Sequence, residues 1–283
     1  MKKRFLILFL TALFALVGAV LRGLNLINGY EPDTQLPVQG DPAETGLIAL
    51  CVVAVVALLA FALSFRAQRG ILFEEAFGGD SVGFKMISVI SGILMIASGA
   101  FGLYLAVSQN VMTAIWSFVP LLILWLLAIL TGCCMIGIAS ALSRDRIVEG
   151  TASLTIIPMF WACFDLIITF KDNGASPFLG LYAFELLAAI ALTYAFYVLA
   201  GFLYSTASPS RFVLSAGMSV VLCGVCVGGA AIALLSGSSS VPFSTDTLLR
   251  YACFFASGLW LFALLALLSR ESNRYTAGKT PEI

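Results

Sequence analysis

Two acidic residues, Asp165 and Glu185, are the side chains of this sequence best placed to do chemistry, because each lies well inside an apolar run. A bare carboxylate in hydrocarbon is costly, so it must be neutralised by a proton, a cation or a basic partner. The basic residues nearest to such a depth are Arg22 and Arg250, which lie near the ends of two other apolar runs. These four residues are the first candidates for a functional site.

Helical spacing places both acids on polar faces of neighbouring runs. In the run 151–170, small and polar residues recur every three or four positions and so share one helix face: Thr155, Pro158, Ala162, Asp165 and Thr169. The run 178–204 repeats this pattern with Tyr182, Glu185, Ala189, Thr193, Tyr197, Ala200 and Tyr204. A turn centred near Gly174 makes the two runs an antiparallel hairpin and puts both acids in the outer half of a bilayer.

Two interpretations of these acids remain open. In one, an arginine from another helix joins Asp165 or Glu185 as a structural ion pair. In the other, one carboxylate binds a proton or cation in a path for a small solute or ion. Tyr182, Thr193 and Tyr197 then line that path.

These interpretations lead to different functions. The polar stripe favours a small-solute or ion transporter or a channel-like protein. The alternative is a non-enzymatic membrane subunit or sensor that meets a protein partner through its loops or another membrane subunit. A lipid-modifying enzyme with a carboxylate base is the third hypothesis. A water-accessible cavity at the acids supports transport, whereas a dry pair bonded to arginine counts against it.

Other chemistry finds little support in the sequence. The chain contains no histidine, which excludes imidazole metal sites and histidine catalysis. It has neither a glycine-rich phosphate loop nor clustered aspartates, so we expect no metal and no cofactor. Cys223 and Cys226 have dithiol spacing but lie in mid-run, which predicts buried packing residues. Gly224 and Gly228, in the same run, predict a central packing helix.

The composition requires a lipid environment for these elements. Hydrophobic residues make up 61% of the 283 residues and charged residues only 11%. The mean hydropathy is +1.05. Such a chain has too few polar groups to cover a soluble globule. Its net charge of zero gives no reason to expect nucleic acid as a partner.

Eight apolar runs are long enough to cross a bilayer, which takes about 20 residues of helix. They cover 5–27, 46–65, 86–107, 113–142, 151–170, 178–204, 212–235 and 247–269. The fold class is therefore all-α, a polytopic transmembrane helical bundle within a single integral-membrane domain spanning 1–283. We expect 270–283 to be a short disordered tail, and the first run to be a signal anchor, with a cleaved signal peptide as the alternative.

The basic residues predict the orientation. With both termini in the cytoplasm, twelve of the fifteen Lys and Arg residues face inward, as expected for a multi-pass protein of the plasma (cytoplasmic) membrane. The inner segment Ile71–Phe77 predicts an interfacial helix that lays Phe73 and Phe77 on the lipid. The acids of the outer segment, Asp41 among them, are expected to be solvated.

Overall fold

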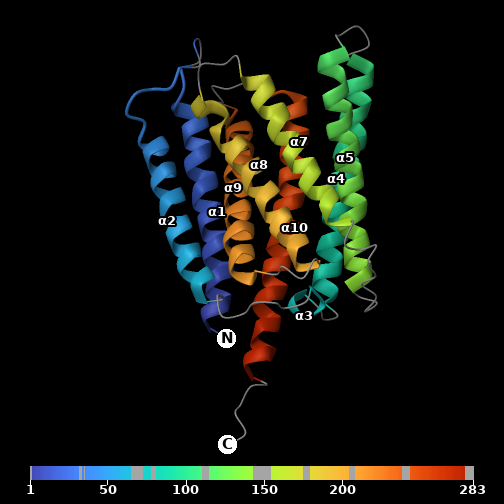
Figure 1. The fold of residues 1–283 in the computed structure, drawn as a ribbon. Helices are drawn as coiled ribbons and strands as arrows, with labels where there is room; N and C mark the ends of the chain where they lie inside the picture. Colours follow the sequence, from blue (N-terminus) through green and yellow to red (C-terminus); the bar gives the residue numbers. More distant parts are fainter. Residues whose placement is uncertain are drawn as a thin grey trace, which may run out of the picture.

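The computed structural model describes residues 2–31, 34, 36–64, 73–77, 81–109, 115–142, 154–174, 179–203, 208–237 and 243–277. The regular structure within these ranges is helical, which confirms the all-α prediction (Figure 1). The helices are α1 (Lys2–Asn28), α2 (Pro42–Ser64), α3 (Phe73–Phe77), α4 (Val82–Gln109), α5 (Ile115–Leu142), α7 (Ile156–Asn173), α8 (Leu179–Leu203), α9 (Pro209–Ser236) and α10 (Thr245–Ala277).

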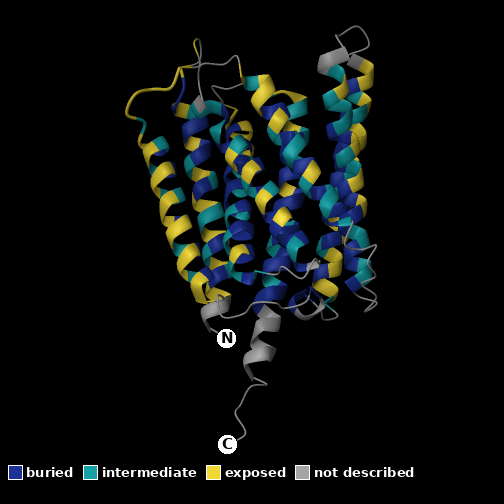
Figure 2. Ribbon diagram, viewed as in Figure 1, coloured by how far each residue is buried: buried dark blue, intermediate teal, exposed yellow. Residues whose placement is uncertain are grey.

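Seven of the described helices are long and apolar enough to cross a membrane: α1, α2, α4, α5, α8, α9 and α10. The predicted fifth span corresponds to α7, which has only 18 residues and carries Asp165, Lys171 and Asp172. Figure 2 shows exposed residues along the outer side of α2 and buried residues along much of α9 and α10. The exposed side chains of α2 include Val52 and Val56, which require a lipid covering. The chain is therefore a polytopic membrane protein.

Helix α9 lies at the centre of one half of the bundle, in contact with α1, α2, α8 and α10. Its glycines permit close packing, since a Cβ on Gly224 would lie 2.7 Å from the Cβ of Ala15 on α1. At Gly228 the corresponding distance to the Cβ of Ala19 is 2.4 Å. The predicted central packing helix is thus confirmed. Its small residues contact α1 of the same chain.

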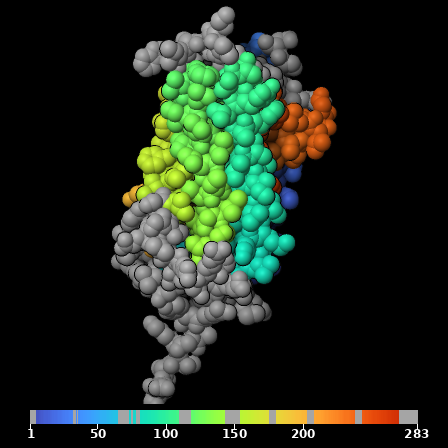
Figure 3. Space-filling model, turned by 90° about the vertical axis from the view of Figure 1, so that its right-hand side faces the viewer, coloured from blue at the N-terminus to red at the C-terminus, as the bar shows by residue number. Residues whose placement is uncertain are grey.

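Helices α4 and α5 lie side by side and cover one face of the molecule (Figure 3). Their backbones approach closely at two glycines, because a Cβ on Gly132 would lie 2.5 Å from the carbonyl oxygen of Gly92. This pair joins the rest of the bundle through α10 and α7. One polar link is the indole N–H of Trp260 on α10, which donates to the hydroxyl of Ser88 at 3.0 Å.

The short helix α3 lies where an interfacial helix was predicted, but its aromatic residues do not face lipid. Phe73 and Phe77 are buried. The ring of Phe77 packs against Phe202 at the end of α8 and Phe212 at the start of α9, with centroid distances of 5.2 and 5.5 Å. The prediction of lipid exposure was wrong because this aromatic cluster offers a packed site under the bundle.

Helix α1 begins and α10 ends at the same end of the bundle, which we call the terminal end (Figure 1). The opposite end, where α1 ends and α2 begins, is the α1–α2 end. Helix α10 continues to Ala277, so the first part of the expected tail is helical, and 278–283 lie outside the described residues. Which end faces the cytoplasm remains a prediction.

The glycine contact between α9 and α1 yields a test of the packing. Gly228→Ala should lower the free energy of unfolding by about 1–3 kcal/mol, because the new methyl group overlaps Ala19. Gly83→Ala is the matched control, since its Cβ would lie 3.9 Å from the nearest heavy atom, the hydroxyl oxygen of Ser81. Thermal unfolding in detergent compares the two variants, and equal melting temperatures would contradict the close packing.

Candidate functional site

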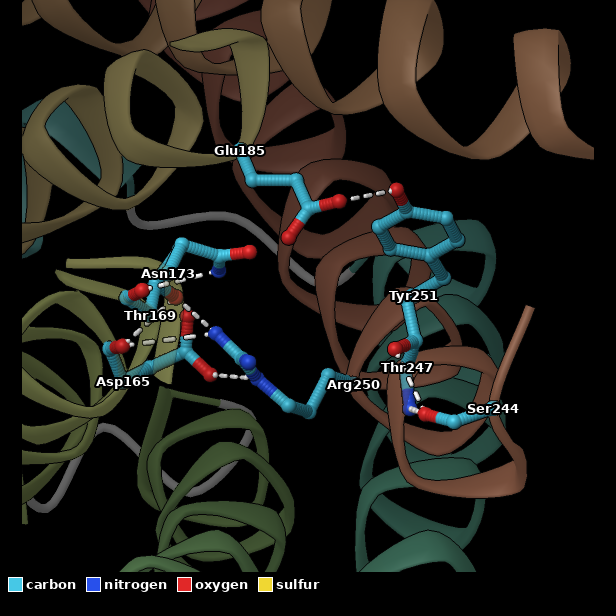
Figure 4. A network of polar contacts seen from close by, with 8 residues as sticks. All are labelled: Asp165, Thr169, Asn173, Glu185, Ser244, Thr247, Arg250 and Tyr251. Atoms are coloured by element: carbon cyan, nitrogen blue, oxygen red, sulfur yellow. Dashed lines mark hydrogen bonds and ion pairs between the residues drawn. The ribbon is translucent and has the colours of Figure 1, made fainter. Parts of the chain in front are cut away.

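The buried ion pair between Arg250 and Asp165 joins α10 to α7. The Nε of Arg250 donates to the Oδ1 of Asp165 at 2.7 Å. A second guanidinium nitrogen donates to the backbone oxygen of Asp165 at 3.4 Å and to the hydroxyl of Thr169. Asp165 has an exposure of 0% and Arg250 of 6%. Figure 4 shows the guanidinium reaching across from α10 to this face of α7.

Local sequence positions both partners. On α7, Asp165, Thr169 and Asn173 follow one another at four-residue intervals, so they form a ladder on one face. The hydroxyl of Thr169 donates to the carbonyl of Asp165 at 2.8 Å, and the amide of Asn173 donates to the carbonyl of Thr169 at 2.9 Å. On α10, the N–H of Thr247 donates to the side chain of Ser244 at 3.1 Å, so Ser244 caps the helix that carries Arg250.

Glu185 bonds to Tyr251, the residue that follows Arg250 on α10. The hydroxyl of Tyr251 donates to the Oε1 of Glu185, and the two side chains point toward one another in Figure 4. Tyr251 is buried and its ring packs against that of Phe254. Glu185 is only partly buried. Consecutive residues of α10 therefore hold an acid on α7 and an acid on α8.

Arg22 is buried in a separate polar cluster at the end of α1. Its Nη1 donates to the amide oxygen of Asn25 at 2.6 Å, and its Nη2 donates to the backbone oxygen of Leu181 on α8 at 2.6 Å. The guanidinium also lies over the ring of Phe184, 5.0 Å from its centroid. This arrangement fixes the first turns of α8 to the last turns of α1.

The cluster around Arg22 continues into the segment that precedes α2. The amide of Asn25 donates to the Oδ2 of Asp41 at 2.7 Å, and the Oδ1 of Asp41 accepts the N–H of Ala43 at 3.0 Å. Asp41 therefore caps α2 and links it to α1. Asp41 was expected to be solvated; it is partly exposed and in addition bonds a buried amide on α1.

Helix α8 connects the two polar clusters. Leu181, which accepts a hydrogen bond from Arg22, lies one turn before Glu185, which accepts one from Tyr251. All of these groups lie in the half of the bundle nearest the α1–α2 end, where Figure 1 shows that α1 and α7 end and that α8 and α10 begin. The polar residues thus form a layer that joins α1, α2, α7, α8 and α10.

The expected path-lining residues of α8 have different surroundings. Tyr182 is buried, whereas the hydroxyl of Thr193 donates to the carbonyl of Ala189 within the same helix at 2.8 Å. Tyr197 has an exposure of 61%, and its ring stacks on Tyr194. The face they share therefore passes from the interior of the bundle to its surface along the helix.

Sequence reasoning named both arginines and both acids but did not place Tyr251, Asn25 and Asp41 in the two clusters. Asn25 was detectable, since it lies one helical turn after Arg22 in an apolar run. Tyr251 carried no such signal. The sulfurs of Cys223 and Cys226 take no part in either cluster, and both residues are buried on α9.

The arrangement leaves one oxygen of the ion pair without a partner. Among the described residues, the Oδ2 of Asp165 is buried and accepts no hydrogen bond. The pair is therefore held by one carboxylate oxygen, and its net charge is zero.

A comparison of the chain with protein-family models, curated proteins and solved structures finds no match.

The buried ion pair predicts a specific pattern of stability in variants. Arg250→Gln should lower the free energy of unfolding by about 3–5 kcal/mol, because it leaves a buried carboxylate unpaired. Asp165→Asn should cost a similar amount by leaving the guanidinium unpaired. The double variant should lose less than the sum of the two, since neither charge remains.

Thermal unfolding in lipid-free detergent measures these differences. Arg211→Gln, which removes an exposed arginine, is the control and should change the free energy by less than about 0.5 kcal/mol. Additive losses in the double variant would contradict a direct interaction between Arg250 and Asp165.

Proposed function

We propose that this chain is a non-transporting integral membrane protein, a subunit or sensor, whose buried charges hold its helices together. The observation that supports this proposal is the buried contact between Arg250 and Asp165. A coupling carboxylate must exchange a proton or cation with water during each cycle. Asp165 instead has no exposed surface and is already neutralised by a guanidinium of the same chain.

The proposal assigns a structural role to Arg22 as well. This arginine donates to Asn25 and to the carbonyl of Leu181, so its guanidinium binds groups of the bundle itself. The described hydrogen bonds of Arg22 do not include Asp165 or Glu185. Those acids bond to Arg250 and Tyr251 of α10 instead. The protein would act through a partner that meets its loops or another membrane subunit. We place it in the plasma membrane with the terminal end in the cytoplasm, following the distribution of Lys and Arg.

A transporter or channel-like protein is the second candidate, and Glu185 favours it. This acid is partly exposed, and its described partner is the neutral hydroxyl of Tyr251 rather than an arginine. A proton or cation on Glu185 would therefore not compete with an internal ion pair. In that case Glu185, and not Asp165, is the coupling group.

Reconstitution in liposomes separates the two candidates. We expect the wild-type protein to carry no proton, sodium or potassium flux above that of protein-free liposomes, because Asp165, the acid with no exposed surface, is paired with Arg250. Internal fluorescent indicators for each ion measure the flux under an imposed gradient. Glu185→Gln and Asp165→Asn are measured in parallel, together with the melting temperature of each preparation.

The two candidates predict different results in this experiment. Flux through the wild-type protein that Glu185→Gln abolishes, with an unchanged melting temperature, would establish the transport candidate. The structural role requires two results: no flux through the wild-type protein, and a lower melting temperature for Asp165→Asn than for the wild type.

A further inference from the structure

A cavity of about 430 Å³ opens between α7, α8 and α9, toward the end of the bundle at which α9 begins. Its lining includes Met159 from α7, Tyr197, Val198 and Gly201 from α8, and Ser208 and Arg211 from α9. None of these residues belongs to the layer around Arg22 and Arg250. The cavity is therefore a separate feature that the buried charges do not explain.

Arg211 is the charged residue of this lining, and it differs from the two buried arginines. It is exposed, whereas Arg22 and Arg250 are buried and bonded to groups of the bundle. Within the part of the chain that the structure describes, Arg211 has neither a hydrogen bond nor an ion pair of its side chain. Its guanidinium is thus available to an anion that enters the cavity.

The rest of the lining is divided by polarity. Met159 and Val198 supply apolar wall, while Ser208 and Tyr197, which also line the cavity, carry hydroxyl groups. A guanidinium binds phosphate oxygens through two parallel hydrogen bonds, and hydroxyls donate to the same oxygens. The apolar wall would suit the glycerol and acyl carbons attached to a phosphodiester. Free phosphate has the same oxygens but nothing to place against this wall.

We propose that this cavity binds the phosphate headgroup of an anionic phospholipid. Basic pockets between transmembrane helices on the cytoplasmic side are typical sites for such headgroups. The terminal end is the end at which twelve of the fifteen basic residues are predicted to gather, which draws anionic lipid to this leaflet. A bound lipid would connect the first turn of α9 with the last turns of α8.

Native mass spectrometry of the full-length protein in a neutral detergent tests this proposal. Phosphatidylglycerol, phosphatidylcholine and inorganic phosphate are titrated separately. We expect phosphatidylglycerol to bind at least about tenfold more tightly than phosphatidylcholine, and inorganic phosphate to bind far more weakly than either. Arg211→Gln should weaken phosphatidylglycerol binding about tenfold, and Arg211→Lys, which keeps the charge without the planar fork, should weaken it less.

Lys85→Gln is the matched control. It removes one exposed positive charge near the start of α4, away from the cavity, and should change the affinity less than about twofold. Equal losses in Arg211→Gln and Lys85→Gln would overturn the proposal in favour of general surface charge. Inorganic phosphate binding as tightly as phosphatidylglycerol would overturn the lipid as the source of the phosphate. Equal affinity for the two lipids would overturn recognition by the arginine.

Discussion

The neutralisation of Arg250 by Asp165 is the polar interaction that ties α7 to α10, while α8 and α5 supply the close packing of α7. This helix carries three charged residues within 18 positions and is the one long described helix that is not apolar enough to count as a candidate span. Its contact with Arg250 removes one of these charges from hydrocarbon without a proton or an ion. Because an unpaired partner in this environment costs several kcal/mol, α7 and α10 stabilise each other.

The helices of the bundle associate by two physical means. Lipid tails are as apolar as leucine, so helices in a membrane associate through close packing and polar contacts. Near the α1–α2 end, hydrogen bonds from Arg22, Arg250 and Tyr251 join the helices. Along α1, Gly224 and Gly228 let that helix approach α9, and at the terminal end the aromatic ring of Phe77 packs between α8 and α9. The two means also meet within the polar layer, where a Cβ on Gly229 of α9 would lie 2.5 Å from the Cγ of Arg22.

Sequence reasoning predicted the helices well because the length of an apolar run is a local property. It also selected Asp165, Glu185, Arg22 and Arg250, since charges in apolar runs need partners. It could not say which arginine meets which acid. Asp165 and Arg250 are 85 positions apart, and their meeting depends on how α7 and α10 rotate about their axes. The same limit hid Tyr251 as the partner of Glu185. It also made lipid exposure of Phe73 and Phe77 a wrong prediction, since their packing partners lie on α8 and α9.

Solid-state nuclear magnetic resonance of the protein in lipid bilayers tests the central ion pair most directly. With ¹⁵N in the arginine side chains and ¹³C in the aspartate carboxyl groups, the dipolar coupling between Arg250 Nε and the Asp165 carboxyl carbon reports their contact. The account predicts a strong coupling that disappears in Arg250→Gln, with no transfer of magnetisation from water to the Asp165 carboxyl. Absence of the coupling, or ready transfer from water, would contradict a dry structural pair and favour a hydrated path through the bundle.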